Sequence, residues 1–207
     1  MVKWAVVVPA KGRPGAKSRL GALPERAALA DAFALDTVTA LLAASAVERV
    51  FVVTGDARLG ALLAGLGATI VAETPAGHDR LNAAIGHGIA AARRACPDAH
   101  LAVMTGDLPA LRPADVETAF ALAADHVLAM VPDADGVGTT ILFARAGVKF
   151  TPRFGPGSRA AHETDGHVAL DLPSTSSARR DVDTPVDLDL ALALGLGPHT
   201  SALITQR

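Results

Sequence analysis

Basic and small residues alternate in a segment near the start of the chain. Residues 9–19 read Pro-Ala-Lys-Gly-Arg-Pro-Gly-Ala-Lys-Ser-Arg, so four of the eleven side chains are basic. Small residues let a backbone approach a ligand, and the basic side chains could neutralise a polyphosphate. The spacing does not match a P-loop, because Lys11 and Ala16 occupy the positions of its two glycines. The segment predicts a phosphate-binding loop, with a solvated basic loop as the alternative.

Aspartates in two later segments could hold a divalent cation. Asp107 lies in Gly-Asp-Leu-Pro after an apolar stretch, and Asp181 and Asp183 lie two residues apart in Arg-Asp-Val-Asp-Thr-Pro. Hard cations such as Mg²⁺ take oxygen ligands. In an extended segment, side chains two residues apart point to the same side. Asp107 could instead form a turn and Asp183 could cap a helix, so only their combination favours a metal site.

Glycine, threonine and serine gather in two segments that could bind an anion. Residues 138–140 read Gly-Thr-Thr, and residues 154–158 read Phe-Gly-Pro-Gly-Ser. Backbone N–H groups and hydroxyls in such segments suit an anionic substrate, and two ordinary surface turns are the alternative. Between the clusters, Glu73 and Asn82 could contact a base edge or cap a helix. The histidines show no metal spacing and are predicted to be surface or structural residues.

Hydrophobic patterning predicts the elements that position these clusters. Strands are predicted at 4–8, 47–54, 68–72, 101–105, 127–131 and 141–143, and helices at 24–44, 57–66, 79–95 and 113–124. A final helix is predicted after the cap Thr184, with Pro185 at its first position. This α/β alternation predicts one domain over residues 1–207, with a mostly parallel sheet and helices on both faces. Ligands bind such sheets at the carboxyl ends of the strands. The basic segment, the two aspartate segments and the Gly-Ser-Thr segments are all predicted to lie there.

Composition excludes several classes of function. The 207 residues carry a net charge of −2, which gives no basic footprint for nucleic-acid binding. The lone Cys96 excludes an internal disulfide and a multi-cysteine zinc site. No stretch reaches the roughly 18 apolar residues of a membrane span, and we expect no signal peptide, because the first apolar stretch is short and leads directly into a polar segment. We expect a cytoplasmic protein without a membrane partner, either a monomer or a homodimer.

The clusters together resemble those of one known family. They read Val-Val-Pro-Ala-Lys (7–11), Lys-Ser-Arg-Leu (17–20), Leu-Asn-Ala-Ala (81–84), Gly-Asp-Leu-Pro (106–109), Gly-Thr-Thr (138–140), Phe-Gly-Pro-Gly-Ser (154–158) and Asp-Thr-Pro (183–185). The chain resembles the guanylyltransferases of coenzyme F420 biosynthesis, which act on phosphoenolpyruvate or 2-phospho-L-lactate. The match spans nearly the whole chain, and residues 154–158 are its most specific part.

The resemblance implies a Rossmann-like nucleotidyltransferase fold of the glycosyltransferase-A type. It implies that GTP, Mg²⁺ and a three-carbon phosphate acceptor bind. The implied GTP-binding residues are Pro9, Ala10, Lys11, Gly12, Lys17, Glu73, Leu81 and Asn82, with Lys11 and Lys17 also catalytic. The implied metal ligands are Asp107 and Asp183, with Asp181 as the fallback, and the implied acceptor-binding residues are Thr139, Thr140, Gly155 and Ser158.

One departure and three alternatives accompany this resemblance. Arg80 stands where the family usually has glycine before Leu-Asn. This difference affects the implied contacts with the base and ribose around residues 77–82, and it leaves the implied reaction class unchanged. The acceptor could instead be 3-phospho-D-glycerate. A molybdenum-cofactor or sugar-type nucleotidyltransferase shares the first loop and Gly-Asp-Leu-Pro, and residues 154–158 argue against it. A nucleotide-binding regulatory module is the alternative without turnover, and paired metal carboxylates argue against that.

Overall fold

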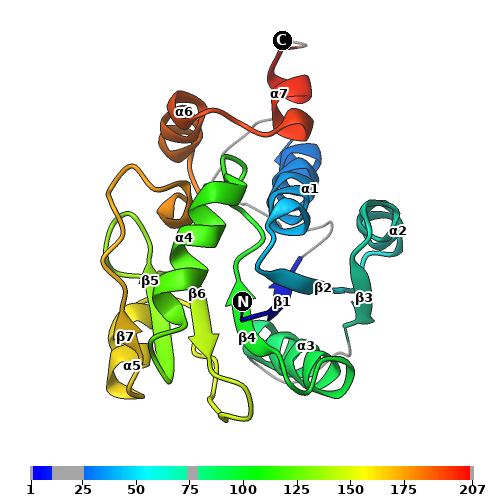
Figure 1. Cartoon of the computed structure of the whole chain (residues 1–207). Helices are drawn as coiled ribbons and strands as arrows, with labels where there is room; N and C mark the ends of the chain where they lie inside the picture. Colours follow the sequence, from blue (N-terminus) through cyan, green and yellow to red (C-terminus); the bar gives the residue numbers. More distant parts are fainter. Residues whose placement is uncertain (1, 11–25, 74–78, 206–207) are drawn as a thin grey trace.

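Strands and helices alternate over most of the chain (Figure 1). The computed structural model describes residues 2–10, 26–73 and 79–205. The elements are, in chain order, β1 (Trp4–Pro9), α1 (Arg26–Ala43), β2 (Val47–Thr54), α2 (Ala57–Leu66), β3 (Thr69–Ala72), α3 (Arg80–Ala95), β4 (His100–Met104), α4 (Pro113–Ala123), β5 (Leu128–Pro132), β6 (Thr139–Ala144), α5 (Ser158–Thr164), β7 (Val168–Ala169), the 3₁₀ helix η2 (Ser177–Arg179), α6 (Pro185–Leu194) and α7 (Pro198–Thr205).

The strands of the described ranges form one sheet in the order β3-β2-β1-β4-β6-β5-β7. Strand β1 pairs in parallel with β2 and β4, β2 with β3, and β5 with β7. Strand β6 runs antiparallel to both β4 and β5. The connection that follows β1 leads to β2, on one flank of the β1–β4 pair, and the connection that follows β4 leads to β5, beyond the other flank. The carboxyl ends of β1 and β4 therefore meet at the topological switch point, where ligands bind in open α/β sheets.

Helices cover both faces of the sheet (Figure 1). On β1, Trp4, Val6 and Val8 belong to a core cluster with residues of α1, α2 and α4. The alternate residues Ala5 and Val7 belong to a second cluster with residues of α3. Successive side chains point to opposite faces, and because helices cover both faces, residues Trp4–Val8 of the strand are all buried. This arrangement confirms the predicted α/β class.

Local sequence signals explain several helix ends. The Asp56 side chain accepts a hydrogen bond from the Leu59 N–H at 2.9 Å, and α2 ends at Gly67, whose φ of 110° is left-handed. Helix α6 begins with a capping box between Thr184 and Asp187, followed by Pro185 at the first position. The predicted start of this last long helix is confirmed.

Helix α3 lies unusually close to the sheet at one glycine. A Cβ atom at Gly88 would overlap the side chains of Val7 and Val53, whereas Gly86 in the same helix has open space around its Cβ position. We expect Gly88→Ala to lower the free energy of unfolding by about 1–3 kcal/mol, because overpacking forces the helix outward. The matched Gly86→Ala control should stabilise the protein by up to about 1 kcal/mol. Denaturant unfolding of both variants checks this, and equal effects would contradict it.

Candidate active site

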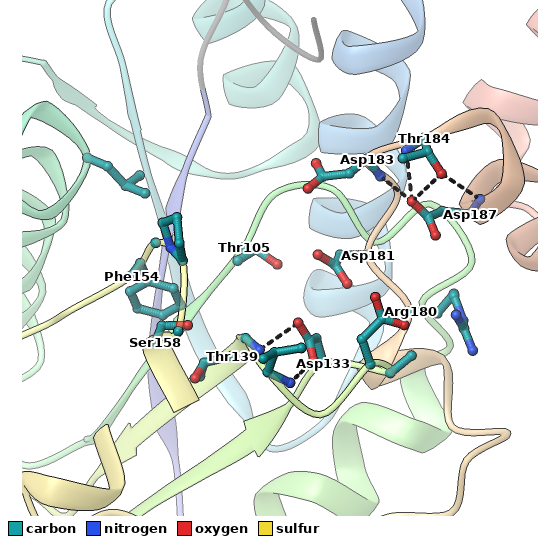
Figure 2. Close-up of a pocket in the computed structure, with 18 residues that line it drawn as sticks. Thr105, Asp133, Thr139, Phe154, Ser158, Arg180, Asp181, Asp183, Thr184 and Asp187 are labelled. Atoms are coloured by element: carbon teal, nitrogen blue, oxygen red, sulfur yellow. Dashed lines mark hydrogen bonds between the residues drawn. The ribbon is translucent and has the colours of Figure 1, made fainter. Parts of the chain in front are cut away.

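A cavity of about 690 Å³ lies beside the carboxyl end of β4 (Figure 2). It is lined by Leu81, Thr105, Asp133, Ala134, Asp135, Val137, Gly138, Thr139, Phe154, Gly155, Pro156, Gly157, Ser158, Arg180, Asp181, Asp183, Thr184 and Asp187. Figure 2 shows Phe154 and Ser158 on one side and Asp181 and Asp183 on the other. In this cavity the acidic segment at residues 181–183 therefore faces the loop at residues 154–158, called the Gly-Ser loop below.

Backbone contacts bring the two candidate metal-binding segments together. The Val182 N–H donates to the Asp107 carbonyl oxygen at 3.0 Å, so Asp107 lies beside the Asp181–Asp183 segment. Gly106 lies against β1, because a Cβ atom there would be 3.0 Å from the Pro9 carbonyl oxygen. The carboxyl ends of β1 and β4 and the segment before α6 therefore meet at the switch point.

Two other aspartates of the cavity have structural contacts. Asp133 accepts hydrogen bonds from the backbone N–H groups of Val137 (2.9 Å) and Gly138 (2.7 Å), which closes the turn between β5 and β6. Asp187 Oδ2 accepts from the backbone N–H groups of Asp183 (3.1 Å) and Thr184 (2.8 Å), and this fixes the start of α6 (Figure 2). Asp187 thereby holds the backbone that carries Asp183 at the cavity.

The donor set is suited to a hard divalent cation. Asp107, Asp181 and Asp183 are carboxylates on adjacent segments, and the Oδ1 atom of Asp107 is shielded from solvent. Over the described part of the chain, no three acidic, histidine or cysteine side chains converge into a complete metal site. Magnesium is usually held by one or two carboxylates together with substrate phosphates and water. Two of these three aspartates would therefore be enough for the protein's share of the ligands.

The loop at residues 154–158 has a backbone that requires glycine. Gly155 has φ 141° and Gly157 has φ 70°, conformations that other residues rarely adopt. The Ser158 N–H donates to the Gly155 carbonyl oxygen at 3.1 Å, which closes the turn, and the Ser158 side chain is buried. The loop therefore presents a defined backbone to the cavity.

Asn82 contacts this loop directly. Its Oδ1 accepts from the Phe154 N–H at 2.9 Å, and its Nδ2 donates to the Phe154 carbonyl oxygen at 3.0 Å. The same Nδ2 donates to the carboxylate of Asp79, which caps α3. Both N–H groups of the amide are therefore in use, and one lone pair of Oδ1 remains for a further donor.

His162 links the loop to β6. Its Nε2 accepts from the Arg153 backbone N–H and its Nδ1 lies 3.0 Å from Thr139 Oγ1. The accepting Nε2 places the proton of the neutral ring on Nδ1, which donates to Thr139. Burial, followed by the nearby charge of His167, lowers the pKa of His162 to about 4. The ring is therefore neutral near pH 7.

The lowered pKa of His162 predicts acid sensitivity. Because the folded pKa of about 4 lies below the ordinary value of 6.5, the unfolded state binds the proton more tightly. We expect the free energy of unfolding to fall by about 2 kcal/mol between pH 7 and pH 5 through this group. Burial lowers the pKa of His167 as well, which acts in the same direction.

Chemical unfolding at the two pH values measures this loss. His162→Gln should remove a large part of the pH dependence, while His126→Gln, outside the buried pair, should keep it. A His162→Gln protein with undiminished pH dependence would contradict the assignment.

The other predicted site residues lie in several places. Ala10 follows β1, where its N–H donates to the Val53 carbonyl oxygen at 2.9 Å, and the Glu73 N–H donates to the Thr54 carbonyl oxygen at 3.2 Å. The buried Thr140 hydroxyl donates to the Ala178 carbonyl oxygen at 2.6 Å, behind the cavity lining. Lys11, Gly12 and Lys17 lie outside the described residues.

Two residues at this site, Arg180 and His162, had no predicted role in binding or catalysis. Arg180 is the one basic side chain among the described residues that line the cavity, and His162 lies directly behind Thr139. Arg180 directly precedes Asp181 in the sequence, and this position next to a candidate metal ligand could have indicated that Arg180 lies at the site. His162 joins segments that are distant in sequence, so no local pattern could indicate its contacts.

Comparison with known proteins defines the class first. A family model for a MobA-like NTP transferase domain matches residues 15–163. A putative nucleotide-diphospho-sugar transferase from Desulfovibrio desulfuricans has the same fold, with a TM-score of 0.66 and 21% identity over 100% of this chain and 98% of its own. A Mycobacterium tuberculosis protein solved with manganese has a TM-score of 0.51 and 21% identity, over 93% of this chain and 99% of its own. The protein is a nucleotidyltransferase.

A closer relative narrows the class. The phosphoenolpyruvate guanylyltransferase of Streptomyces coelicolor is 49% identical over 205 residues, which cover 98% of this chain and 96% of that protein. The chain belongs to the phosphoenolpyruvate guanylyltransferase family. No helix within the described residues is long and apolar enough to cross a membrane.

Proposed function

We propose that the protein transfers the GMP group of GTP to the phosphate of phosphoenolpyruvate and releases pyrophosphate. The observation that supports this most is that the Asp181–Asp183 segment and the Gly-Ser loop face each other across one cavity. Membership of the phosphoenolpyruvate guanylyltransferase family supports the choice of substrates. The product would be enolpyruvoyl-2-diphospho-5'-guanosine. We also infer from the family that the reaction serves coenzyme F420 biosynthesis and takes place in the cytoplasm.

The chemistry requires charge neutralisation more than proton transfer. An acceptor phosphate oxygen attacks the α-phosphorus of GTP, the new P–O bond forms, and the bond to pyrophosphate breaks. The attacking oxygen is already anionic near neutral pH, so no strong general base is needed. The protein must instead bring two polyanions together and stabilise the charge on the leaving pyrophosphate.

We propose that the nucleotide and the metal bind near the switch point, where β1 and β4 end. Lys11 and Lys17 would hold the triphosphate, in a loop with Pro9, Ala10 and Gly12, and the segment containing Glu73, Leu81 and Asn82 would lie near the guanosine. Asp107 and Asp183, with Asp181 beside them, would hold Mg²⁺. When bound, the cation would offset the negative charge of both substrates. Arg180 adds a fixed positive charge at the same wall.

The proposed acceptor contacts come from the opposite wall. Thr139, Gly155 and Ser158 line the cavity and would bind the phosphate and carboxylate of the acceptor, with Thr140 behind them. These anions are common to phosphoenolpyruvate, 2-phospho-L-lactate and 3-phospho-D-glycerate. A site that hydrogen-bonds a substrate hydroxyl can reject analogues without it by about 10⁴-fold, whereas apolar contacts discriminate about 10- to 200-fold. Among the described residues, the contacts proposed here serve the phosphate and the carboxylate and none is dedicated to a glycerate hydroxyl, which favours phosphoenolpyruvate.

Base selection provides the test of the nucleotide assignment. Pyrophosphate release should be faster with GTP than with ATP when phosphoenolpyruvate and Mg²⁺ are saturating. Both nucleotides should be tested at equal concentrations below saturation, so that the ratio of initial rates reports kcat/KM. Equal rates with ATP and GTP would refute the guanine preference, and pyrophosphate release without an acceptor would point to hydrolysis instead.

A further inference from the structure

Two side chains from different helices hold consecutive peptide groups just before the Gly-Ser loop. His162 of α5 accepts from the Arg153 N–H at 3.0 Å, and Asn82 of α3 accepts from the Phe154 N–H at 2.9 Å. Asn82 also donates to the Phe154 carbonyl oxygen at 3.0 Å. The backbone that leads into Gly155 is therefore fixed by three hydrogen bonds to side chains.

Packing around these bonds leaves the backbone little freedom. The Phe154 ring is buried and meets the His162 ring edge to face, with 5.4 Å between the ring centroids. His162 is fully buried and also contacts Thr139 Oγ1, so a single ring joins both segments of the proposed acceptor site. Figure 2 shows Phe154, Ser158 and Thr139 on the same side of the cavity.

The glycines make this support necessary. Gly155 and Gly157 adopt positive φ angles, and glycine has access to many other backbone conformations. A glycine-rich loop binds an anion well only when its N–H groups are held in place before the ligand arrives. The fixed peptides at Arg153 and Phe154 supply that support from the amino-terminal end of the loop.

We propose that Asn82 and His162 are positioning residues for the acceptor, a small molecule with one phosphate and one carboxylate. They hold residues 153–158 so that the loop and Thr139 meet the two anions of the acceptor. This inference rests on the proposed function, because it takes this loop as the acceptor site. Asn82 would then have a second role besides a contact with the nucleotide, because its amide group hydrogen-bonds both the N–H and the carbonyl oxygen of Phe154.

The proposal predicts which kinetic constant changes. Loosening the loop should raise the KM for phosphoenolpyruvate about tenfold or more in Asn82→Ala, because small misplacements of binding groups weaken binding steeply. The KM for GTP should rise less than the KM for phosphoenolpyruvate in Asn82→Ala, where a nucleotide contact is also lost. It should stay within about twofold when His162 is replaced, because His162 has no proposed nucleotide contact. A residue that only stabilised the fold would reduce the active fraction and lower kcat without changing the KM for the acceptor.

Two substitutions of His162 separate its bonds. Glutamine can present an acceptor near the position of Nε2, so His162→Gln should keep the bond to Arg153 and a near-native KM for phosphoenolpyruvate. Asparagine is too short to reach the Arg153 N–H, so His162→Asn should raise that KM about tenfold. This pair keeps the test open to refutation even if Asn82→Ala does not fold.

Steady-state kinetics with GTP and phosphoenolpyruvate varied separately decide the matter. Matched controls are Arg94→Ala on the exposed side of α3 and Thr164→Ala at the end of α5, which should match the unaltered protein. An unchanged KM for phosphoenolpyruvate in Asn82→Ala and His162→Asn, or a selective rise in the KM for GTP, would overturn the inference alone. Absence of product from the unaltered protein would overturn the proposed function.

Discussion

Replacing Asp107 or Asp183 with asparagine is expected to abolish turnover while leaving the fold intact. Each substitution removes one negative charge from a proposed metal ligand with almost no change in volume. The Val182 N–H donates to the backbone carbonyl of Asp107, and Asp187 holds the backbone N–H of Asp183. Asparagine keeps both backbone contacts. We expect a loss in kcat on the order of 1,000-fold, equivalent to about 4 kcal/mol.

Pyrophosphate release at saturating Mg²⁺ measures this loss. Asp189→Asn, an exposed aspartate on α6 outside the cavity, is the matched control and should keep full activity. Thermal unfolding should show that all three variants are folded. Near-native activity in Asp107→Asn and Asp183→Asn would contradict the metal assignment, and activity lost in Asp181→Asn instead would make Asp181 the ligand.

Replacing Lys17 with methionine is expected to have the second-largest effect. In the sequence, the basic segment that we propose to bind the triphosphate follows β1, whose carboxyl end lies at the switch point, and the attack on the α-phosphorus brings two polyanions together. Methionine keeps much of the length of the lysine side chain and removes the charge. Loss of one positioned donor to developing charge commonly costs about 100- to 1,000-fold, so we expect kcat/KM for GTP to fall by about 100-fold or more.

A matched lysine is available at the amino end of β1. Lys3 stands before β1, and its Nζ donates to the Ser45 carbonyl oxygen at 2.7 Å. Lys3→Met removes the same charge away from the switch point and should leave kcat/KM for GTP within about twofold. Equal kinetic losses in both variants would show that net charge, and not the position of Lys17, controls activity.

Local signals in the sequence predicted much of the frame of the site. The Thr-Pro-x-Asp pattern at Thr184 predicted the start of α6, because a capping box depends only on residues three apart. Alternating apolar stretches predicted the parallel strands and so the edge of the sheet where the clusters lie. These features depend on neighbours in the chain, which a sequence displays directly.

Contacts between distant residues explain what the sequence did not show. The strand predicted at 141–143 begins earlier, at Thr139, and as β6 it pairs antiparallel with β4 and β5. Helix α7 was not predicted, since its first N–H groups are held by the carboxylate of Asp36, which accepts from His199 at 2.9 Å and Thr200 at 2.8 Å. Such partners lie far apart in the sequence, so no local pattern reveals them.

The most direct test of the central claim is to identify the reaction product. The protein is incubated with GTP and Mg²⁺ and with phosphoenolpyruvate, 2-phospho-L-lactate or 3-phospho-D-glycerate separately, and each product is weighed by mass spectrometry. We expect the mass of enolpyruvoyl-2-diphospho-5'-guanosine with phosphoenolpyruvate, formed faster than the product from 3-phospho-D-glycerate. A strong preference for 3-phospho-D-glycerate would contradict the acceptor assignment, and no guanylylated product from any acceptor would contradict the proposed activity.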